Sequence, residues 1–265
     1  MSSIHYAFFR VGRNFFYSSN LFPRAVRDEV AVLYAFVRYV DDLVDRPRPL
    51  VEHFYRAWRL LDAALDGRVS PPVIGDFAEL AARRGFDRRW VEAFMESMEM
   101  DLYKQRYATY GELLRYMYGS AEVIGLFMAR ILGLPRESHP YAMLLGRAYQ
   151  LINIIRDVGE DLRLGRVYIP EEDLAKFGLS DIRPGPHFDE LIRYELARYH
   201  AVQREAEKGY KYIPRRYRPA IKTASDLYKR TAMIISKQPS LVLRRKVRPS
   251  FRDVVLLWVK NSLAP

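Results

Sequence analysis

Residues 150–161 read QLINIIRDVGED, and this stretch decides the fold. Its polar residues Gln150, Asn153, Asp157 and Asp161 are separated by three, four and four positions, a spacing that places side chains on one face of an α-helix. The residues between them are mostly leucine, isoleucine and valine. The pattern therefore predicts a helix in a bundle core, with a polar stripe whose buried amides and carboxylates need partners.

A second segment, YAFVRYVDDLVD at residues 34–45, repeats this device. Asp41 and Asp45 are four apart, and Arg38 and Tyr34 continue the same stripe. The apolar neighbours predict partial burial, where carboxylates are unfavourable unless they are neutralised. Carboxylates and phosphate oxygens together hold Mg²⁺, which would neutralise them; a solvated acidic face paired with Arg38 and Arg46 is the alternative. Two such helices facing one another favour the metal–diphosphate interpretation.

The rest of the chain predicts an all-α protein with one domain over residues 1–265. No proline interrupts 73–134, 141–169 or 187–213, which leaves room for long helices. Alternating apolar and polar runs are scarce, and the best strand-like fragment, Arg166–Pro170, is short. No internal repeat, low-complexity tract or domain linker is present.

Composition excludes several classes of function. The chain has 265 residues, of which 49% are hydrophobic and 28% charged, enough for a sizeable core. It has no cysteine, which rules out disulfide scaffolds, thiolate metal sites and cysteine nucleophiles. Neither a G-x-G turn, an H-E-x-x-H helix nor a G-x-S-x-G elbow occurs, so no dinucleotide-binding loop, zinc protease or serine hydrolase is indicated.

The net charge of +11 suits an anionic partner. No nucleic-acid-binding motif accompanies it, so we expect no nucleic acid. The opening residues have no apolar signal region, and no stretch approaches the roughly 18–20 apolar residues of a membrane span. We expect a cytoplasmic protein that can associate peripherally with a membrane. The basic tail Arg244–Arg252 is interpreted as an ordinary or lipid-facing surface rather than a contact to substrate.

At these motifs the sequence resembles the squalene/phytoene synthase family, the head-to-head prenyl transferases. Gln150–Pro170 and Tyr34–Asp45 carry most of the resemblance, and Met98–Leu102 and Tyr118 with Gly125 extend it. The resemblance runs from about residue 14 to residue 248, in the family's order and spacing. It implies a single-domain isoprenoid-synthase helical bundle with a central apolar cavity.

The resemblance also implies roles for individual residues and cofactors. The catalytic residues would be four aspartates, which act through the metal ions that they hold: Asp41, Asp45, Asp157 and Asp161. The metal would be Mg²⁺, with Mn²⁺ as an alternative. The substrates would be prenyl diphosphates. The implied metal ligands are Asp41, Asp45, Asn153, Asp157 and Asp161. The implied substrate-binding residues are Tyr34, Arg38, Tyr118, Gln150, Asn153 and Arg156.

The reaction implied by the resemblance joins two prenyl diphosphates head to head through a cyclopropylcarbinyl diphosphate. Geranylgeranyl diphosphate giving phytoene is our first expectation. A squalene or dehydrosqualene synthase using farnesyl diphosphate is an alternative, with NADPH required only if the enzyme is of the squalene type. A non-catalytic assembly or scaffold relative of the same fold is the alternative from another class.

Three residues depart from the family pattern. Asn14 stands where a serine or threonine is usual, and Ser240 stands where many members carry a tyrosine beside the diphosphate. Glu122 replaces a small residue on the helix expected to form the wall of the prenyl tunnel. It would either face the tunnel or pair with an arginine or lysine on a slightly rotated helix, and we expect the pairing.

Overall fold

The computed structural model describes residues 18–263, so the expectations for Asn14 and for neighbouring Phe15 lie outside the described residues. The all-α prediction is confirmed. Within the described part, the strand-like fragment Arg166–Pro170 forms only an isolated β-bridge between Val167 and Arg106. No helix in this part of the chain is both long enough and apolar enough to cross a membrane.

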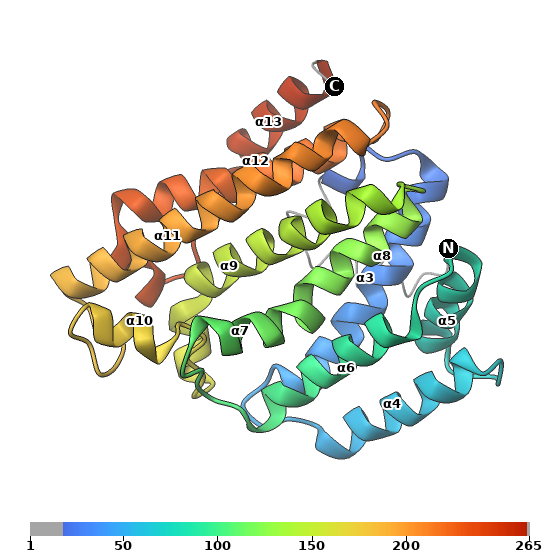
Figure 1. Ribbon diagram of the computed structural model, residues 1–265, viewed down its shortest axis with the longest axis horizontal. Helices are drawn as coiled ribbons and strands as arrows, with labels where there is room; N and C mark the ends of the chain where they lie inside the picture. The colour runs from blue at the N-terminus through green and yellow to red at the C-terminus, as the bar shows by residue number, and fades with distance from the viewer. Residues whose placement is uncertain (1–17, 264–265) are drawn as a thin grey trace.

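The described chain consists of α-helices joined by short turns, 3₁₀ segments and one π-helical segment (Figure 1). The α-helices are α3 (Arg24–Val44), α4 (Val51–Leu65), α5 (Pro72–Arg84), α6 (Arg88–Tyr103), α7 (Tyr110–Met117), α8 (Val123–Ile131), α9 (His139–Arg163), α10 (Glu171–Lys176), α11 (Pro186–Glu207), α12 (Arg218–Lys237) and α13 (Phe251–Leu263). The other segments are the π-helix η1 (Tyr118–Glu122) and the 3₁₀ segments η2 (Arg136–Ser138), η3 (Lys208–Tyr212) and η4 (Pro239–Leu243).

Local sequence explains several helix ends. The side chain of Asp87 caps α6 by accepting a hydrogen bond from the Arg89 backbone, and Thr109 caps α7 in the same way. The last turn of α5 closes on Gly85, whose φ of 63° lies in the left-handed region that favours glycine. Pro140 lies in the first turn of α9, where a proline costs no internal hydrogen bond.

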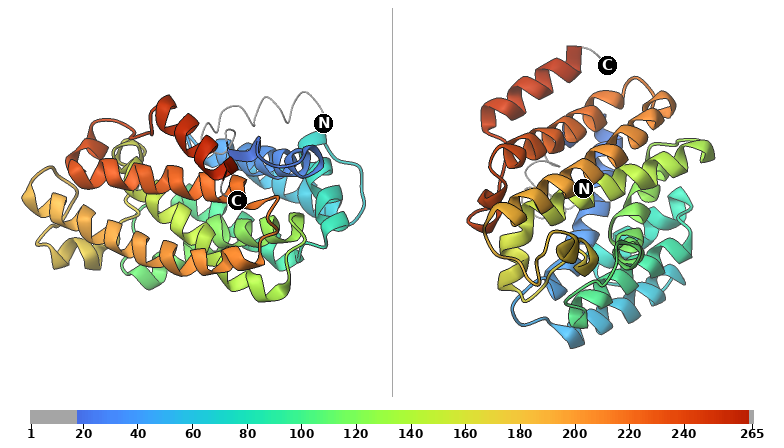
Figure 2. Two further views of the ribbon diagram at one scale, coloured as in Figure 1. Left: turned by 90° about the horizontal axis from the view of Figure 1, so that it is seen from above. Right: turned by 60° about the vertical axis from the view of Figure 1, so that its left-hand side comes forward.

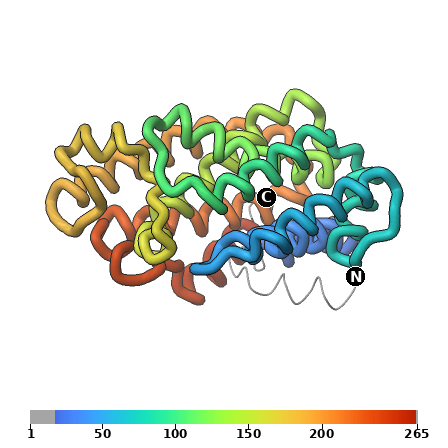
Figure 3. The backbone as a smooth tube through the Cα atoms, turned by 90° about the horizontal axis from the view of Figure 1, so that it is seen from below, coloured from blue at the N-terminus to red at the C-terminus, as the bar shows by residue number. Residues whose placement is uncertain are grey.

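The long helices run side by side, with α13 at one edge of the molecule and α4 at the opposite edge (Figure 1). The yellow segment with α10 lies at one end, and the cyan turn between α4 and α5 lies at the other (Figure 3). Two hydrophobic clusters form the interior. One is built largely from α3 to α6 and α8, and the other largely from α7, α9 and α11. The polar stripes of α3 and α9 therefore belong to helices of different clusters.

Small residues bring η1 and α8 against α9. A Cβ atom on Gly125 would lie 2.1 Å from the carbonyl oxygen of Ala142, and one on Gly146 would lie 2.2 Å from that of Ala121. Both distances are far below contact, so only glycine permits this backbone approach. Figure 2 gives two further views of the packed helices.

Candidate active site

The first acidic helix, α3, presents Arg38, Asp41 and Asp45 at its C-terminal end. Arg38 Nη1 donates to Asp41 Oδ2 at 2.9 Å, and its Nη2 lies 2.5 Å from Asp42 Oδ1. Asp45 follows the last helical residue and lies 3.2 Å from Arg166 Nη1. One guanidinium from the same helix and one from a distant segment thus face these carboxylates.

The second acidic helix, α9, presents the predicted stripe in the same pocket. Arg156 binds its neighbour Asp157 through two hydrogen bonds, 2.7 Å from Nε to Oδ1 and 2.6 Å from Nη2 to Oδ2. Lys246 Nζ lies 3.1 Å from Asp157 Oδ2 and donates to Glu160 at 2.6 Å. Among the described residues, the buried Oδ1 of Asn153 has no hydrogen-bond partner. That oxygen is an acceptor that a ligand or metal would satisfy.

The two acidic helices line one polar pocket of about 470 Å³. Nearly all the predicted site residues line it, which is the arrangement expected for two acidic helices facing one another in a bundle. The predicted residues in its lining are Tyr34, Arg38, Asp41, Asp45, Gln150, Asn153, Arg156, Asp157 and Asp161.

Asp41 and Asp161 are incompletely neutralised by the protein itself. Burial raises the pKa of Asp41 to about 7, and the charge of Asp45 adds to the shift. Burial raises the pKa of Asp161 to about 8, with further contributions from Asp157 and Asp45. Each shift means that burial and the neighbouring carboxylates disfavour the ionised form more than the nearby arginine favours it. A bound cation would stabilise the ionised form.

Asp101 and Arg166 complete one wall of the pocket, although neither is among the site residues predicted from the sequence. Asp101 accepts hydrogen bonds from Tyr116 (2.9 Å) and Tyr168 (2.6 Å). Burial raises its pKa to about 6, although Arg166 and the two hydroxyls oppose the shift. Arg166 Nη2 donates to the carbonyl oxygens of Val44 and Asp101, at 2.7 and 2.9 Å. This guanidinium therefore ties the end of α3 to the end of α6.

The basic tail, predicted to lie on the surface, contributes two cations to the lining of the pocket. Lys246 and Arg248 line the polar pocket, and Arg248 is also exposed, as are Arg244 and Arg245. The run of basic residues was the only feature of the sequence that pointed to these cations. Which of its members turn inward depends on the path of the chain after η4.

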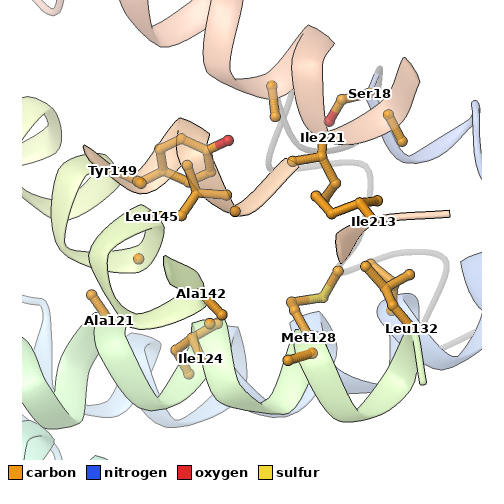
Figure 4. Close-up of a pocket in the computed structure, with 18 of the residues that line it drawn as sticks. Ser18, Ala121, Ile124, Met128, Leu132, Ala142, Leu145, Tyr149, Ile213 and Ile221 are labelled. Carbon is orange, nitrogen blue, oxygen red and sulfur yellow. The ribbon is translucent and has the colours of Figure 1, made fainter. Parts of the chain in front are cut away.

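An apolar cavity of about 250 Å³ adjoins the polar pocket. Both are lined by Tyr34, Gln150, Asn153 and Tyr228, so the two spaces meet at these four residues. Side chains from η1 and α8, together with Ala142 of α9, lie on one side of the open space, and Leu145, Tyr149, Ile213 and Ile221 lie on the other (Figure 4). The expected central apolar cavity is present.

Tyr118 is the one predicted site residue that the polar pocket does not include. It lines neither pocket, and it is 36% exposed at the start of η1. A π-helical turn holds more residues than an α-helical turn, which shifts the register of the faces on either side of it. Ser120 and Ala121 consequently line the cavity, and Tyr118 faces outward.

Glu122 pairs with an arginine, as expected, and does not line the apolar cavity. Its carboxylate is buried and lies 2.7 Å from Nε of Arg147 on α9. Ser240 also lies outside both pockets and donates to Asp189 at 2.5 Å. Position 159 requires glycine, because a Cβ atom there would lie 2.6 Å from the carbonyl oxygen of Val242 in η4.

The donor set of the pocket fits Mg²⁺ that is shared with a diphosphate. Within the described part of the chain, no group of three or more acidic or histidine side chains forms a ready-made metal cage. Mg²⁺ needs only one or two carboxylates when phosphate oxygens and water complete its octahedron. The paired aspartates on each helix and the unpartnered Asn153 oxygen meet that requirement.

Comparisons with known proteins agree with this geometry. The family model described as squalene/phytoene synthase matches residues 9–253. The 15-cis-phytoene synthase of Synechococcus elongatus is 29% identical, over 94% of this chain and 88% of the relative. The presqualene diphosphate synthase of Rhodopseudomonas palustris is 35% identical, over 66% of this chain and 64% of the relative.

Solved structures share the fold. A dehydrosqualene synthase in complex with ligand superposes with a TM-score of 0.89 at 22% identity, covering 98% of this chain and 94% of that one. The squalene synthase HpnC from Alicyclobacillus acidocaldarius gives a TM-score of 0.80 at 26% identity, covering 89% and 92%.

Fold, site and relatives together define a prenyl transferase of isoprenoid biosynthesis. The chain belongs to the squalene/phytoene synthase family, which uses a divalent metal with diphosphate substrates. The scaffold alternative is therefore set aside.

Proposed function

We propose that the chain condenses two molecules of geranylgeranyl diphosphate head to head to give phytoene, with Mg²⁺ as cofactor and Mn²⁺ as a substitute. The observation that carries the proposal is the junction of the acidic pocket with the apolar cavity at Tyr34, Gln150, Asn153 and Tyr228. A prenyl diphosphate has the same two-part chemistry, a charged head and a long apolar tail. The frequent naming of phytoene synthases among the relatives supports the C20 substrate.

The chain's own residues would act as follows. Asp41 and Asp45 on one side, and Asn153, Asp157 and Asp161 on the other, would hold the metal ions. Bound there, Mg²⁺ would neutralise the departing diphosphate as the allylic C–O bond ionises.

Four cations in the pocket would contact diphosphate oxygens directly. Arg38, Arg156, Lys246 and Arg248 all line the pocket, and guanidinium groups suit such oxygens because they can donate two parallel hydrogen bonds. Positive charge at the leaving group lowers the barrier to ionisation.

The apolar cavity would hold the prenyl tail and exclude water from the carbocation. Its lining is almost entirely aliphatic, aromatic or small, with Met128, Leu132 and Ile221 among the side chains that face the space in Figure 4. A largely apolar wall keeps out water, the nucleophile that would otherwise trap a cation. Loss of a proton would then end the phytoene-type reaction.

A second candidate is dehydrosqualene or squalene synthesis from farnesyl diphosphate. The 35% identity to the presqualene diphosphate synthase of Rhodopseudomonas palustris favours it. NADPH would be consumed only in the squalene-type reaction.

Product analysis tests both candidates. The protein is incubated with farnesyl or geranylgeranyl diphosphate, with and without Mg²⁺ and with and without NADPH, and the hydrocarbons are analysed by mass. A C40 product that needs Mg²⁺ but not NADPH supports the proposal. A C30 product from farnesyl diphosphate alone would replace it with the second candidate.

A further inference from the structure

The apolar cavity offers few groups that could accept a proton. Among the described residues that line it, none is a carboxylate, histidine, lysine or arginine. The side-chain acceptors that remain are hydroxyl and amide oxygens. A reaction that ends by proton loss inside this cavity therefore needs one of these oxygens, or the released diphosphate, to take the proton.

Three hydroxyl groups form a hydrogen-bonded path that begins at the cavity wall. The hydroxyl of Tyr149 lies 2.7 Å from Oγ of Ser225, and the hydroxyl of Tyr210 donates to the same oxygen at 2.6 Å. Tyr149 and Tyr210 line the cavity from α9 and η3, and Ser225 of α12 is fully buried. Because hydroxyl protons turn about their C–O bonds, such a path can carry hydrogen bonds in either direction.

The path continues outward to a carboxylate. Burial raises the pKa of Tyr210, and the charge of Glu207 and a hydrogen bond to it add to the shift. Glu207, the last residue of α11, accepts a hydrogen bond from Gln203 at 2.8 Å and pairs with Lys229 Nζ at 2.8 Å. Its side chain is 27% exposed, so water reaches this end of the path.

The other end of the path lies beside the place where the reacting carbons would bind. Tyr149 directly precedes Gln150, and its ring centroid is 4.4 Å from that of Tyr228. Gln150 and Tyr228 are two of the four residues at which the polar pocket and the apolar cavity meet. A substrate with its diphosphate in the pocket and its tail in the cavity has its head carbons at this junction. Figure 4 shows Tyr149 beside the open space.

We propose that Tyr149 accepts the proton whose loss ends the reaction, and that Ser225, Tyr210 and Glu207 carry it to solvent. The inference rests on the proposed function, in which a carbocation remains after the second diphosphate has left. A C–H bond beside the cationic carbon breaks, and its electron pair forms the new C=C bond. The proton binds the Tyr149 oxygen while the hydroxyl proton of Tyr149 passes to Ser225. Onward transfers through Tyr210 end on a carboxylate oxygen of Glu207.

The four residues have different roles in this transfer. A hydrogen beside a carbocation is acidic enough for a neutral hydroxyl oxygen to accept it, so Tyr149 is the catalytic residue. Ser225, Tyr210 and Glu207 are positioning residues that act through Tyr149. Diphosphate released into the polar pocket is the rival acceptor, and it needs no hydroxyl path.

Tyr149→Phe tests the first acceptor. The protein is incubated with geranylgeranyl diphosphate and Mg²⁺, the extract is treated with phosphatase, and all C40 products are measured by mass. The share of phytoene should fall at least tenfold, because a positioned proton acceptor typically contributes about 100-fold or more. Cyclopropylcarbinyl diphosphate, recovered as its alcohol, should still form.

Tyr199→Phe is the matched control. Tyr199 is fully buried, lines neither the cavity nor the polar pocket, and its hydroxyl has no hydrogen-bond partner among the described residues. Its removal should leave the share of phytoene unchanged, and thermal melting confirms that both variants fold. An unchanged share in Tyr149→Phe would assign the proton to diphosphate and overturn the proposal. Equal losses in the two variants would overturn it as well.

The outer part of the path is tested with Ser225→Ala and Glu207→Gln. Both should lower the share of phytoene, whereas Glu205→Gln, at a position 49% exposed on the same helix and paired with Lys208, should not. Substrate deuterated at C1 supplies a readout that a structural role would not move. Deuterium should lower the share of phytoene more in Ser225→Ala and Glu207→Gln than in the wild type, because slower proton transfer makes C–H cleavage limiting. The same isotope effect in all these proteins would refute the relay.

Failure of the relay and failure of the proposed function give different results. Phytoene made in equal share by the wild type and by Tyr149→Phe overturns the relay alone. A wild type that makes no phytoene refutes the proposed function. If it instead makes a C30 hydrocarbon from farnesyl diphosphate without NADPH, that reaction also ends by proton loss, and a lower share of it in Tyr149→Phe would support the relay. A product that forms only with NADPH ends by hydride transfer and overturns both.

Discussion

The polar pocket and the apolar cavity meet at four residues, yet they are built by opposite means. The pocket is made by long charged side chains that reach in from α3, α9 and the segment after η4. The cavity is lined instead by small and apolar side chains from several helices, among them Ser120, Ala121 and Ala142. Charges placed by local spacing can be found in a sequence, whereas empty space depends on how closely helices approach.

The largest effect should come from the pocket. Asp41→Asn or Asp157→Asn should lower turnover by roughly 1,000-fold or more, because each removes a carboxylate that would hold the metal and diphosphate. Product formation from radiolabelled prenyl diphosphate measures it, with helical content checked by circular dichroism. Asp62→Asn, on the exposed face of α4, is the control. Wild-type turnover in either pocket variant would refute the metal assignment.

The next effect concerns the boundary between η1 and α9. Glu122→Gly should cost about 2–3 kcal/mol of unfolding free energy, because it leaves Arg147 without its partner and adds a helical glycine. The product should not change, since Glu122 does not line the cavity. Denaturant unfolding and product analysis on the same sample separate the two readouts. A longer or redirected product would show that Glu122 acts on the tunnel after all.

A smaller effect should follow from filling the cavity. Ala142→Phe should shift the preference from the C20 toward the C15 substrate by about tenfold in kcat/KM, because discrimination by tail length in an apolar site is modest. Its side chain faces the open space in Figure 4. Ala201→Phe, on the exposed face of α11, is the control. An unchanged ratio in Ala142→Phe would mean that tails bind elsewhere.

The smallest effect is a change in stability with pH. The pKa of Asp161 is about 8 in the fold and near 3.8 in the unfolded chain. Between these values the folded state holds the extra proton, so the unfolding free energy falls as pH rises. Asp161→Asn should flatten this decline and stabilise the metal-free protein at pH 8.5 by at least about 1.4 kcal/mol, the value of one pKa unit.

Thermal melting from pH 5 to 8.5 measures the effect, and Mg²⁺ should raise the melting temperature of the wild type more at the high end. A slope identical in wild type and Asp161→Asn would contradict the buried-carboxylate account. Asp62→Asn again serves as the unaffected comparison.

Much of the polar pocket could be predicted from the sequence by itself. Helical spacing alone placed Gln150, Asn153, Asp157 and Asp161 on one stripe, and the same rule grouped Arg38, Asp41 and Asp45. The apolar residues around both stripes predicted the all-α fold. Such patterns are local, because a helix fixes which residues share a face whatever else the chain does.

Only the tertiary structure decided the rest. Arg166, Lys246 and Arg248 enter the pocket from segments whose path no periodicity records, and Tyr118 leaves it because a π-turn shifts the helical register. The close backbone approach at Gly125, where a Cβ atom would lie 2.1 Å from a carbonyl oxygen, likewise depends on how the helices pack. The same is true of the apolar side chains that α13 exposes. Spacing along the chain determines what one helix presents, but contacts between distant segments determine which side chains meet, because those depend on the packing of all the helices together.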